Sequence, residues 1–205
     1  MMKIVIFGAS GSVGRYLITE AVRQGHEVIA VGRQVSSLQP QAHVTVKAVD
    51  YNQPADLVDA AKGDDAAIIS LGDLGVVQPT EAIIQALQAV DITRVEILTG
   101  FGGSRRSRWQ LNPVMHVIVW AARLAYYRGF HNKELQDRII RNSGLTFTIV
   151  QPPTLTFDAT TGTYRHGDYR GKSLLGHISR ADLTEFMVTN LTSQRYQNQS
   201  VFVQQ

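Results

Sequence analysis

A series of three glycines directly after an apolar run constrains the fold of this chain more than any other feature. Residues 2–7 are apolar almost without a break, which is typical of a strand buried on both faces of a sheet. Gly8, Gly11 and Gly14 follow with the spacing GxxGxxG, and a helical pattern over residues 12–24 begins inside the series. Glycines at these positions let the chain turn tightly off the strand and let the helix pack close to the sheet.

The next eighty or so residues continue the alternation of strands and helices. The predicted strands cover residues 27–31, 44–49, 66–71 and 94–98, and the predicted helices cover residues 54–61 and 80–90. Pro54 suits a first helical turn, and Thr80 suits a helix cap. Continuous apolar strands that alternate with helices are typical of a parallel sheet covered on both faces. We therefore predict an α/β fold: a single-domain Rossmann fold with a doubly wound, mostly parallel sheet.

The pattern is less regular after residue 100. We expect a loop at 102–108, helices at 114–127 and 132–142, a strand at 145–150, a hairpin or irregular loop at 163–172, a helix from Ser179 and a strand at 201–203. The pairs Glu134–Arg138 and Asp137–Arg141 support the second helix, and Ser179 with Asp182 forms a capping box. We expect the apolar 114–127 segment to be part of the core. The alternatives are a pocket wall, a lid or a dimer face. No linker divides the chain, so we expect one domain over 1–205 with a small substrate-side region at about 151–180.

Composition excludes several kinds of site. The chain has no cysteine, which rules out disulfides and thiolate sites, and its six histidines show no metal-ligand spacing. No apolar run reaches the roughly 18 residues of a membrane span, and the N-terminus lacks a signal sequence. We therefore expect a cytoplasmic monomer or homodimer with no metal and no membrane or nucleic-acid partner. Residues 102–205 carry 13 Lys/Arg against 6 Asp/Glu, which favours either an anionic partner or a plain solvated face.

The glycine series also predicts a ligand. A helix that starts inside it points unpaired backbone N–H groups and the positive end of its dipole at the turn. The usual occupant is the pyrophosphate of a dinucleotide, which we favour over a purely structural turn because the series opens a βαβ pattern. The residues that we expect at this pyrophosphate are Gly8, Ser10, Gly11, Ser12 and Val13.

The end of the second predicted strand selects between the two nicotinamide dinucleotides. NAD sites usually place an acidic residue here for the ribose 2′-hydroxyl, whereas this chain has Arg33. A guanidinium matches the 2′-phosphate of NADP in charge and geometry, and Arg15 is placed to assist. We therefore favour NADP, and NAD stays open because Arg33 would serve both cofactors if it only stacked on the adenine.

Other strand ends are expected to supply the remaining cofactor contacts, because the ligand of a doubly wound sheet crosses the carboxyl ends of its strands. Asp50 is placed to accept a hydrogen bond from the adenine amino group, with a helix-cap role as the alternative, and Tyr51 follows it. We expect the backbone at Ser70, Leu71 and Gly72 beside the ribose. Around the nicotinamide ring of the cofactor, and a molecule that would lie against it, we expect Leu71, Gly72, Thr99, Gly100, Phe101, Pro152 and Thr154.

Several segments resemble a known family. They are KIVIFGASGSVGR at 3–15, VGR at 31–33, VDYNQPADLVDAAKGDDAAIISLG at 49–72, NSGLTFTIVQPPTL at 142–155 and ISRADL at 178–183. The chain is similar over almost its whole length to atypical short-chain dehydrogenase/reductases of the NAD(P)H-binding, NmrA-like kind. It most resembles the flavin reductase/biliverdin-IX-beta reductase group and bacterial NADH-flavin reductases. The resemblance implies a Rossmann fold, a nicotinamide cofactor and reductase activity.

The chain departs from the catalytic patterns of these relatives. Short-chain dehydrogenases use a YxxxK pair, and Lys133 falls at the lysine position, but Gly129 stands where the tyrosine is expected. Tyr126–Tyr127 lies one helical turn too early to replace it. The biliverdin reductase group has a serine and a histidine where this chain has Gly100 and Thr154. These differences argue against reduction that needs a positioned proton donor.

Hydride transfer to a flavin or quinone needs no such donor, because the acceptor takes its proton from water. We therefore predict an NADPH-dependent reductase for a flavin, quinone or similar planar acceptor, with flavin as a substrate and not a resident group. Lys133 is the candidate catalytic residue, through a hydrogen bond to the nicotinamide ribose; the alternative is a solvated lysine. Arg105, Arg106 and Arg108 would attract an anionic acceptor. An NADP(H)-binding sensor or scaffold without catalysis, or a sugar-nucleotide epimerase-like enzyme, remains an alternative.

Overall fold

The computed structural model describes residues 1–72, 74–193 and 195–205, and its core is an eight-stranded sheet. The strands run in the order β3 (Val44–Ala48), β2 (Glu27–Gly32), β1 (Lys3–Phe7), β4 (Ala66–Ile69), β5 (Arg94–Leu98), β6 (Thr146–Gln151), β10 (Gln199–Gln204) and β8 (Arg165–Gly167). All neighbours are parallel except β10 and β8, which are antiparallel. The order reverses between β1 and β4, which makes this the doubly wound sheet that the apolar runs predict.

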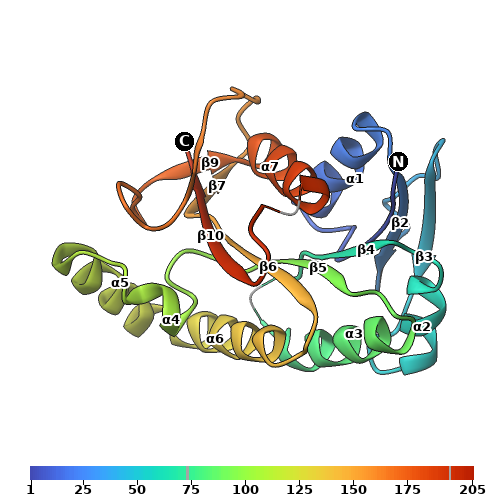
Figure 1. Cartoon of the computed structure of the whole chain (residues 1–205), viewed down its shortest axis with the longest axis horizontal. Helices are drawn as coiled ribbons and strands as arrows, with labels where there is room; N and C mark the ends of the chain where they lie inside the picture. Colours follow the sequence, from blue (N-terminus) through green and yellow to red (C-terminus); the bar gives the residue numbers. More distant parts are fainter. Residues whose placement is uncertain (73, 194) are drawn as a thin grey trace.

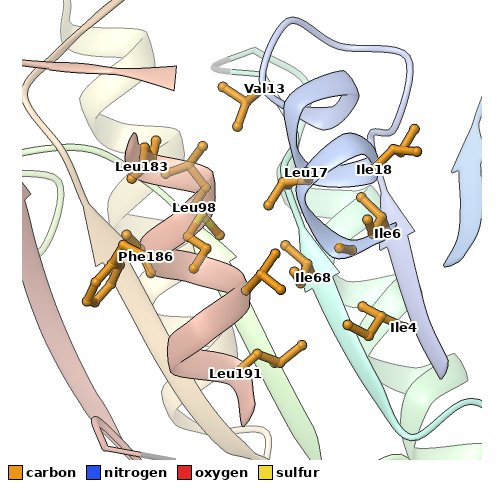
Figure 2. Close-up of a cluster of buried hydrophobic side chains, with 14 of the residues drawn as sticks. Ile4, Ile6, Val13, Leu17, Ile18, Ile68, Leu98, Leu183, Phe186 and Leu191 are labelled. Atoms are coloured by element: carbon orange, nitrogen blue, oxygen red, sulfur yellow. The ribbon is translucent and has the colours of Figure 1, made fainter. Parts of the chain in front are cut away.

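Helices cover both faces of the sheet (Figure 1). One face packs against α1 (Gly14–Arg23) and α7 (Arg180–Ser193), and the other packs against α2 (Pro54–Ala61), α3 (Val77–Ala89) and α6 (Tyr127–Arg141). Figure 2 shows the first of these layers, in which side chains of α1 and α7 meet strand residues of β1, β4 and β5. Both layers are mainly apolar, as expected for strands buried on both sides. Each also buries a polar contact: Arg94 pairs with Glu96 beneath α7, and Gln136 of α6 donates to Thr80 of α3.

A third apolar cluster lies beyond the end of the main core. It joins α5 (Pro113–Ala125), which follows the short helix α4 (Arg105–Arg108), to the sheet through Phe101, Met115, Val119, Tyr169 and Phe202. A separate two-stranded parallel sheet, β7 (Thr154–Thr156) with β9 (His177–Ser179), lies near the start of α7. These elements surround the carboxyl ends of β4, β5 and β6.

The structure corrects the starts of two predicted helices and contains one helix that was not predicted. The third helix begins at Val77, so Thr80 is not its cap; the Thr80 hydroxyl instead donates to the carbonyl oxygen of Val76 at 2.6 Å. The predicted loop at 102–108 contains α4, because the Ser104 hydroxyl accepts a hydrogen bond from the Ser107 N–H and caps it. The helix expected at 132–142 begins at Tyr127, directly after α5.

One predicted ion pair and one predicted segment also differ in the structure. Glu134 pairs with Arg108 and Arg123 from neighbouring helices, and not with Arg138, whereas the Asp137–Arg141 pair forms as expected. Residues 163–172 do not form a hairpin with each other. They contain β8, which pairs with β10 in the main sheet. Ser179 caps the N–H of Asp182 as predicted, while the Asp182 carboxylate binds the 160–162 segment.

Candidate functional site

The turn after β1 leaves no room for side chains at two of its glycines. Gly8 has a positive φ of 84°, and a Cβ there would lie 2.2 Å from the carbonyl oxygen of Ser70. A Cβ on Gly14 would lie 2.3 Å from the carbonyl oxygen of Gly8, whereas one on Gly11 would lie 3.1 Å from the same atom. Both short distances are far below van der Waals contact, so glycine is required for the turn and for the packing of α1 on it.

The N-terminus of α1 is open. Its N-cap, Val13, has no side-chain capping bond, and the first turn carries no acidic residue. Within the described residues, no hydrogen bond occupies the backbone N–H groups of Ser12 and Val13. The positive end of the helix dipole and these donors therefore face the space above the glycine turn, which is the arrangement that binds pyrophosphate.

Two adjoining cavities open at this turn. The smaller has a volume of about 420 Å³ and the larger a volume of about 1020 Å³. Both are lined by Gly11, Ser70, Leu71, Gly72 and Leu74. They meet at the carboxyl ends of β1 and β4, where the strand order reverses and ligands of doubly wound sheets bind.

The smaller cavity contains most of the residues predicted for the adenosine half of the cofactor. Gly8, Ser10, Arg33 and Tyr51 line it together with the shared residues. Arg33 is exposed, so its guanidinium is available to a ligand. Tyr51 is buried, its hydroxyl has no hydrogen-bond partner within the described chain, and burial raises its pKa. An unpaired buried hydroxyl next to a cavity fits a site that is completed by a ligand.

Two predicted residues do not line either cavity. The Asp50 carboxylate accepts hydrogen bonds from the backbone and side-chain nitrogens of Asn52, both at 2.9 Å, so it forms a local turn. It is not the cap of α2 either, because Gln53 takes that position. Arg15 donates to the Ser37 hydroxyl at 2.9 Å and contacts the Ser10 carbonyl at 3.4 Å, which directs it along the outside of the turn.

The larger cavity gathers the residues predicted around the reacting rings. The walls include Ser12, Val13, Thr99, Gly100, Phe101, Lys133, Pro152 and Thr154. Leu124, Tyr126 and Tyr127 also line it, in agreement with the alternative that the 114–127 segment forms a pocket wall. Four other wall residues were not predicted from the sequence: Phe130, Leu155, Leu174 and Arg180. Among the described lining residues, none is aspartate, glutamate or histidine.

Lys133 is part of the cavity wall and not a solvated lysine. Only 6% of the residue is exposed, which overturns the alternative of a lysine on an exposed helix turn. Its Nζ donates to the carbonyl oxygen of Gly72 at 2.9 Å and lies 3.5 Å from that of Leu71. The ammonium group of α6 thus holds the segment that follows β4, which both cavities share.

Arg180 places a second cation on the cavity wall. Its Nη1 donates to the carbonyl oxygens of Leu155 and Thr156 at 3.1 and 2.8 Å. Its guanidinium carbon lies 3.8 Å from the centre of the Phe157 ring, a cation–π contact. Arg180 belongs to the ISRADL segment, which carries part of the family resemblance. Nothing in that segment gave a reason to place Arg180 in the site.

The three arginines proposed to attract an anionic acceptor lie outside both cavities. Arg105 and Arg106 are exposed on α4. Arg108 pairs with Glu134 and donates to the Gly102 carbonyl at 2.8 Å, so it links α4 to α6. No cluster of three metal-ligating side chains occurs in the described part of the chain. Over the same residues, none of the helices has the length and apolar character needed to cross a bilayer.

Comparisons with known proteins identify the family of this chain. Residues 8–194 match the NAD(P)H-binding family. A Bacillus subtilis protein named "Uncharacterized sugar epimerase YhfK" is 27% identical, over 97% of this chain and 92% of that protein.

Solved structures share the fold at lower identity. A Veillonella parvula short-chain dehydrogenase/reductase in complex with NADP superposes with a TM-score of 0.84 at 18% identity, covering 100% of this chain and 94% of that one. ChuY from Escherichia coli O157:H7, described as an anaerobilin reductase, has a TM-score of 0.82 at 21% identity, covering 98% and 96% of the two chains. With the glycine turn, the open helix end and the family match over most of its length, this chain belongs to the NAD(P)H-binding family of Rossmann-fold proteins.

Proposed function

We propose that the protein is an NADPH-dependent reductase that passes a hydride to a flavin, a quinone or a similar planar acceptor. The observation that carries the proposal is the larger cavity, which continues from the cofactor cleft and is lined mainly by apolar and glycine residues. Its size and its aromatic wall suit a second flat molecule beside the nicotinamide.

The described wall of the cavity has no aspartate, glutamate or histidine, and it lacks the proton donors of relatives at their usual positions. Gly129, Gly100 and Thr154 stand at the positions where relatives have tyrosine, serine and histidine. A bound reduced nicotinamide would supply the hydride, and the residues of this chain would hold the two rings in contact and exclude water between them. Phe101, Tyr126 and Phe130 provide apolar surface for that purpose.

The assignment of NADPH rests on Arg33. Its exposed guanidinium lies at the end of β2 on the smaller cavity, where the ribose of the adenosine half is expected. Arginine matches a 2′-phosphate in charge and in bidentate geometry. An acidic residue at the same position would have favoured NAD.

The direct test is a titration of the purified protein with NADPH and NADH, followed by acceptor assays. The proposal expects tighter binding of NADPH and a loss of the absorbance of reduced nicotinamide when FMN, FAD or a soluble quinone is added. Binding of NADPH without turnover across a wide acceptor panel would contradict the catalytic part.

That second result would favour the alternative, a sensor or scaffold that binds NADP(H) without catalysis. The absence of a tyrosine at position 129 is the observation in its favour. Epimerase-like chemistry on a nucleotide sugar is weaker, because the YxxxK pair that relatives use is incomplete here. The name of the Bacillus subtilis relative gives a reason to include nucleotide sugars in the panel.

A further inference from the structure

Helix α5 carries an apolar surface that faces solvent. Val114, Val117, Trp120 and Leu124 are each between 62% and 67% exposed, and their spacing of three and four residues places them along one face of the helix. We call these four residues the outer face of α5. An exposed apolar row of this kind is unusual on a protein surface and marks a site of interaction.

The opposite face of α5 is already anchored, so the outer face is not an incompletely packed core. Met115 and Val119 are buried in the third apolar cluster against Phe101, Tyr169 and Phe202. Asn112 caps the helix by accepting a hydrogen bond from the Met115 N–H at 2.8 Å. Figure 1 shows α5 at one end of the molecule, away from the sheet.

The surroundings of the outer face carry positive charge. The sequence from 97 to 133 contains no aspartate or glutamate, but it contains five arginines and one lysine. Arg105 and Arg106 are exposed just before α5, and Arg128 is exposed just after it. Glu134, the acid that follows this stretch, is paired with Arg108 and Arg123. The partner of this face is therefore expected to be anionic.

A second copy of the chain is a poor occupant for this face. In a two-fold dimer the same patch meets itself, so parallel or antiparallel packing of two α5 helices brings Arg105, Arg106 and Arg128 against one another. Like charges at an interface oppose association. An acidic protein would satisfy the charge, but the row of Val, Trp and Leu offers it no polar side chain to pair with.

We propose that the outer face of α5 docks the protein on an anionic lipid surface. A short helix with an apolar face, a tryptophan and flanking arginines is the pattern of a helix that lies in the membrane interface without crossing it. Trp109, Tyr126 and Tyr127 are exposed beside this face and are suited to the headgroup level. The proposal revises the expectation that the protein has no membrane partner, and it goes beyond the proposed reductase function.

The same surface borders the larger cavity. Leu124, Tyr126 and Tyr127 are exposed and also line that cavity, so its rim is continuous with the outer face of α5. Docking would therefore hold one wall of the cavity at the lipid surface. An acceptor dissolved in the membrane would have a short path to it.

Co-flotation of the full chain with vesicles tests the proposal without any activity measurement. The probes are vesicles of phosphatidylcholine alone and of phosphatidylcholine mixed with phosphatidylglycerol, at low and high salt. The wild-type protein should float with the anionic vesicles at low salt, and much less with neutral vesicles or at high salt.

Two double variants separate the apolar and electrostatic contributions. Val117→Ser with Trp120→Ser should abolish flotation without changing the charge. Gln85→Ser, at an exposed polar position on α3, should leave flotation unchanged. Arg105→Gln with Arg106→Gln should weaken binding about 30-fold, since each arginine near an anionic surface contributes roughly a five-fold factor. Arg195→Gln with Lys62→Gln removes the same charge at exposed positions outside α4, α5 and α6 and should have a much smaller effect.

Unchanged thermal unfolding and NADPH titration of each variant would show that it is folded. Absence of wild-type flotation with anionic vesicles overturns the proposal. Sedimentation that reveals a dimer which the Val117→Ser, Trp120→Ser variant dissociates also overturns it, and assigns the face to a second copy. Flotation needs no electron acceptor, so a failed reductase assay would not contradict the docking proposal.

Discussion

The Nζ of Lys133 lies 2.9 Å from the carbonyl oxygen of Gly72 and joins helix α6 to the segment after β4. This contact connects the wall of the larger cavity to the segment that both cavities share. A buried ammonium group at that point fixes the backbone that both cavities share, beside the expected position of the nicotinamide ribose. Its role is therefore open to a direct test.

Replacement of Lys133 by methionine should lower kcat/KM for NADPH by about 10- to 100-fold, the factor expected for loss of a charged hydrogen bond. Lys133→Arg keeps the charge and should recover part of the activity. The measurements are steady-state kinetics with the acceptor found by screening, and NADPH binding by calorimetry. Equal binding and turnover in wild type and Lys133→Met would reduce this lysine to a purely structural residue.

Replacement of Arg33 by alanine should weaken NADPH binding by about 10- to 100-fold, because a charge-assisted contact to the 2′-phosphate is lost. Binding of NADH should change little, since it has no phosphate at that position. Calorimetry with both nucleotides measures the difference. Arg15→Ala is the matched control, as Arg15 is directed to Ser37, and a larger effect there than at Arg33 would show that the wrong arginine has been assigned.

Replacement of Gly14 by alanine should destabilise the fold by about 3 kcal/mol, because overpacking against backbone has no flexible group to displace. The new Cβ would lie 2.3 Å from the Gly8 carbonyl oxygen. Denaturant unfolding measures the change. Gly100→Ala is the control, since a Cβ there meets nothing within 4 Å, and it should remain as stable as wild type. Equal stability of both variants would mean that α1 does not pack on the turn as described.

Asp182 should make stability depend on pH in the acidic range. Burial by itself raises the pKa of its carboxyl, but hydrogen bonds from Thr160, Gly162 and Thr161 outweigh burial and lower the pKa to about 2. The pKa is therefore lower in the folded state than the ordinary 3.8. The carboxylate contributes stability above pH 4, by roughly 2 kcal/mol, and this contribution is lost as the pH falls toward 2.

Unfolding free energies of wild type and Asp182→Asn across this range provide the test. The variant should be less stable at neutral pH and should lack the acid-dependent decrease. Asp158→Asn changes an exposed carboxyl of the same segment and should behave like wild type. If Asp182→Asn unfolds with the same pH dependence as wild type, other carboxyl groups are responsible.

Local sequence signals predicted most of the sheet and the cofactor turn. The apolar runs predicted β1, β2, β4, β5 and β6 because strands buried on both sides need continuous apolar residues. The edge strand β3 is only partly buried. Gly8 and Gly14 stood at positions that admit no Cβ. Long-range pairing was harder to predict. β8 is three residues long and is held by β10, more than thirty residues later, so nothing local identified it.

Cavity residues that follow strands could be predicted from the sequence. Cavity residues that helices bring into place were harder to predict. Arg33, Tyr51 and Thr99 follow strands, and parallel strands end at one edge of the sheet. Tyr126 reaches the cavity only because α5 and α6 pack beside it, an arrangement that depends on tertiary contacts. Asp50 also follows a strand, but its carboxylate accepts hydrogen bonds from Asn52 and does not line either cavity.

Helices α5 and α6 meet at one residue, Tyr126, which ends the first and begins the second. Because no loop separates the two helices, a displacement of α5 moves the start of α6 as well. Tyr126 and Tyr127 stand at that joint and also form part of the cavity wall. Any partner bound to α5 would therefore act directly on the wall of the larger cavity.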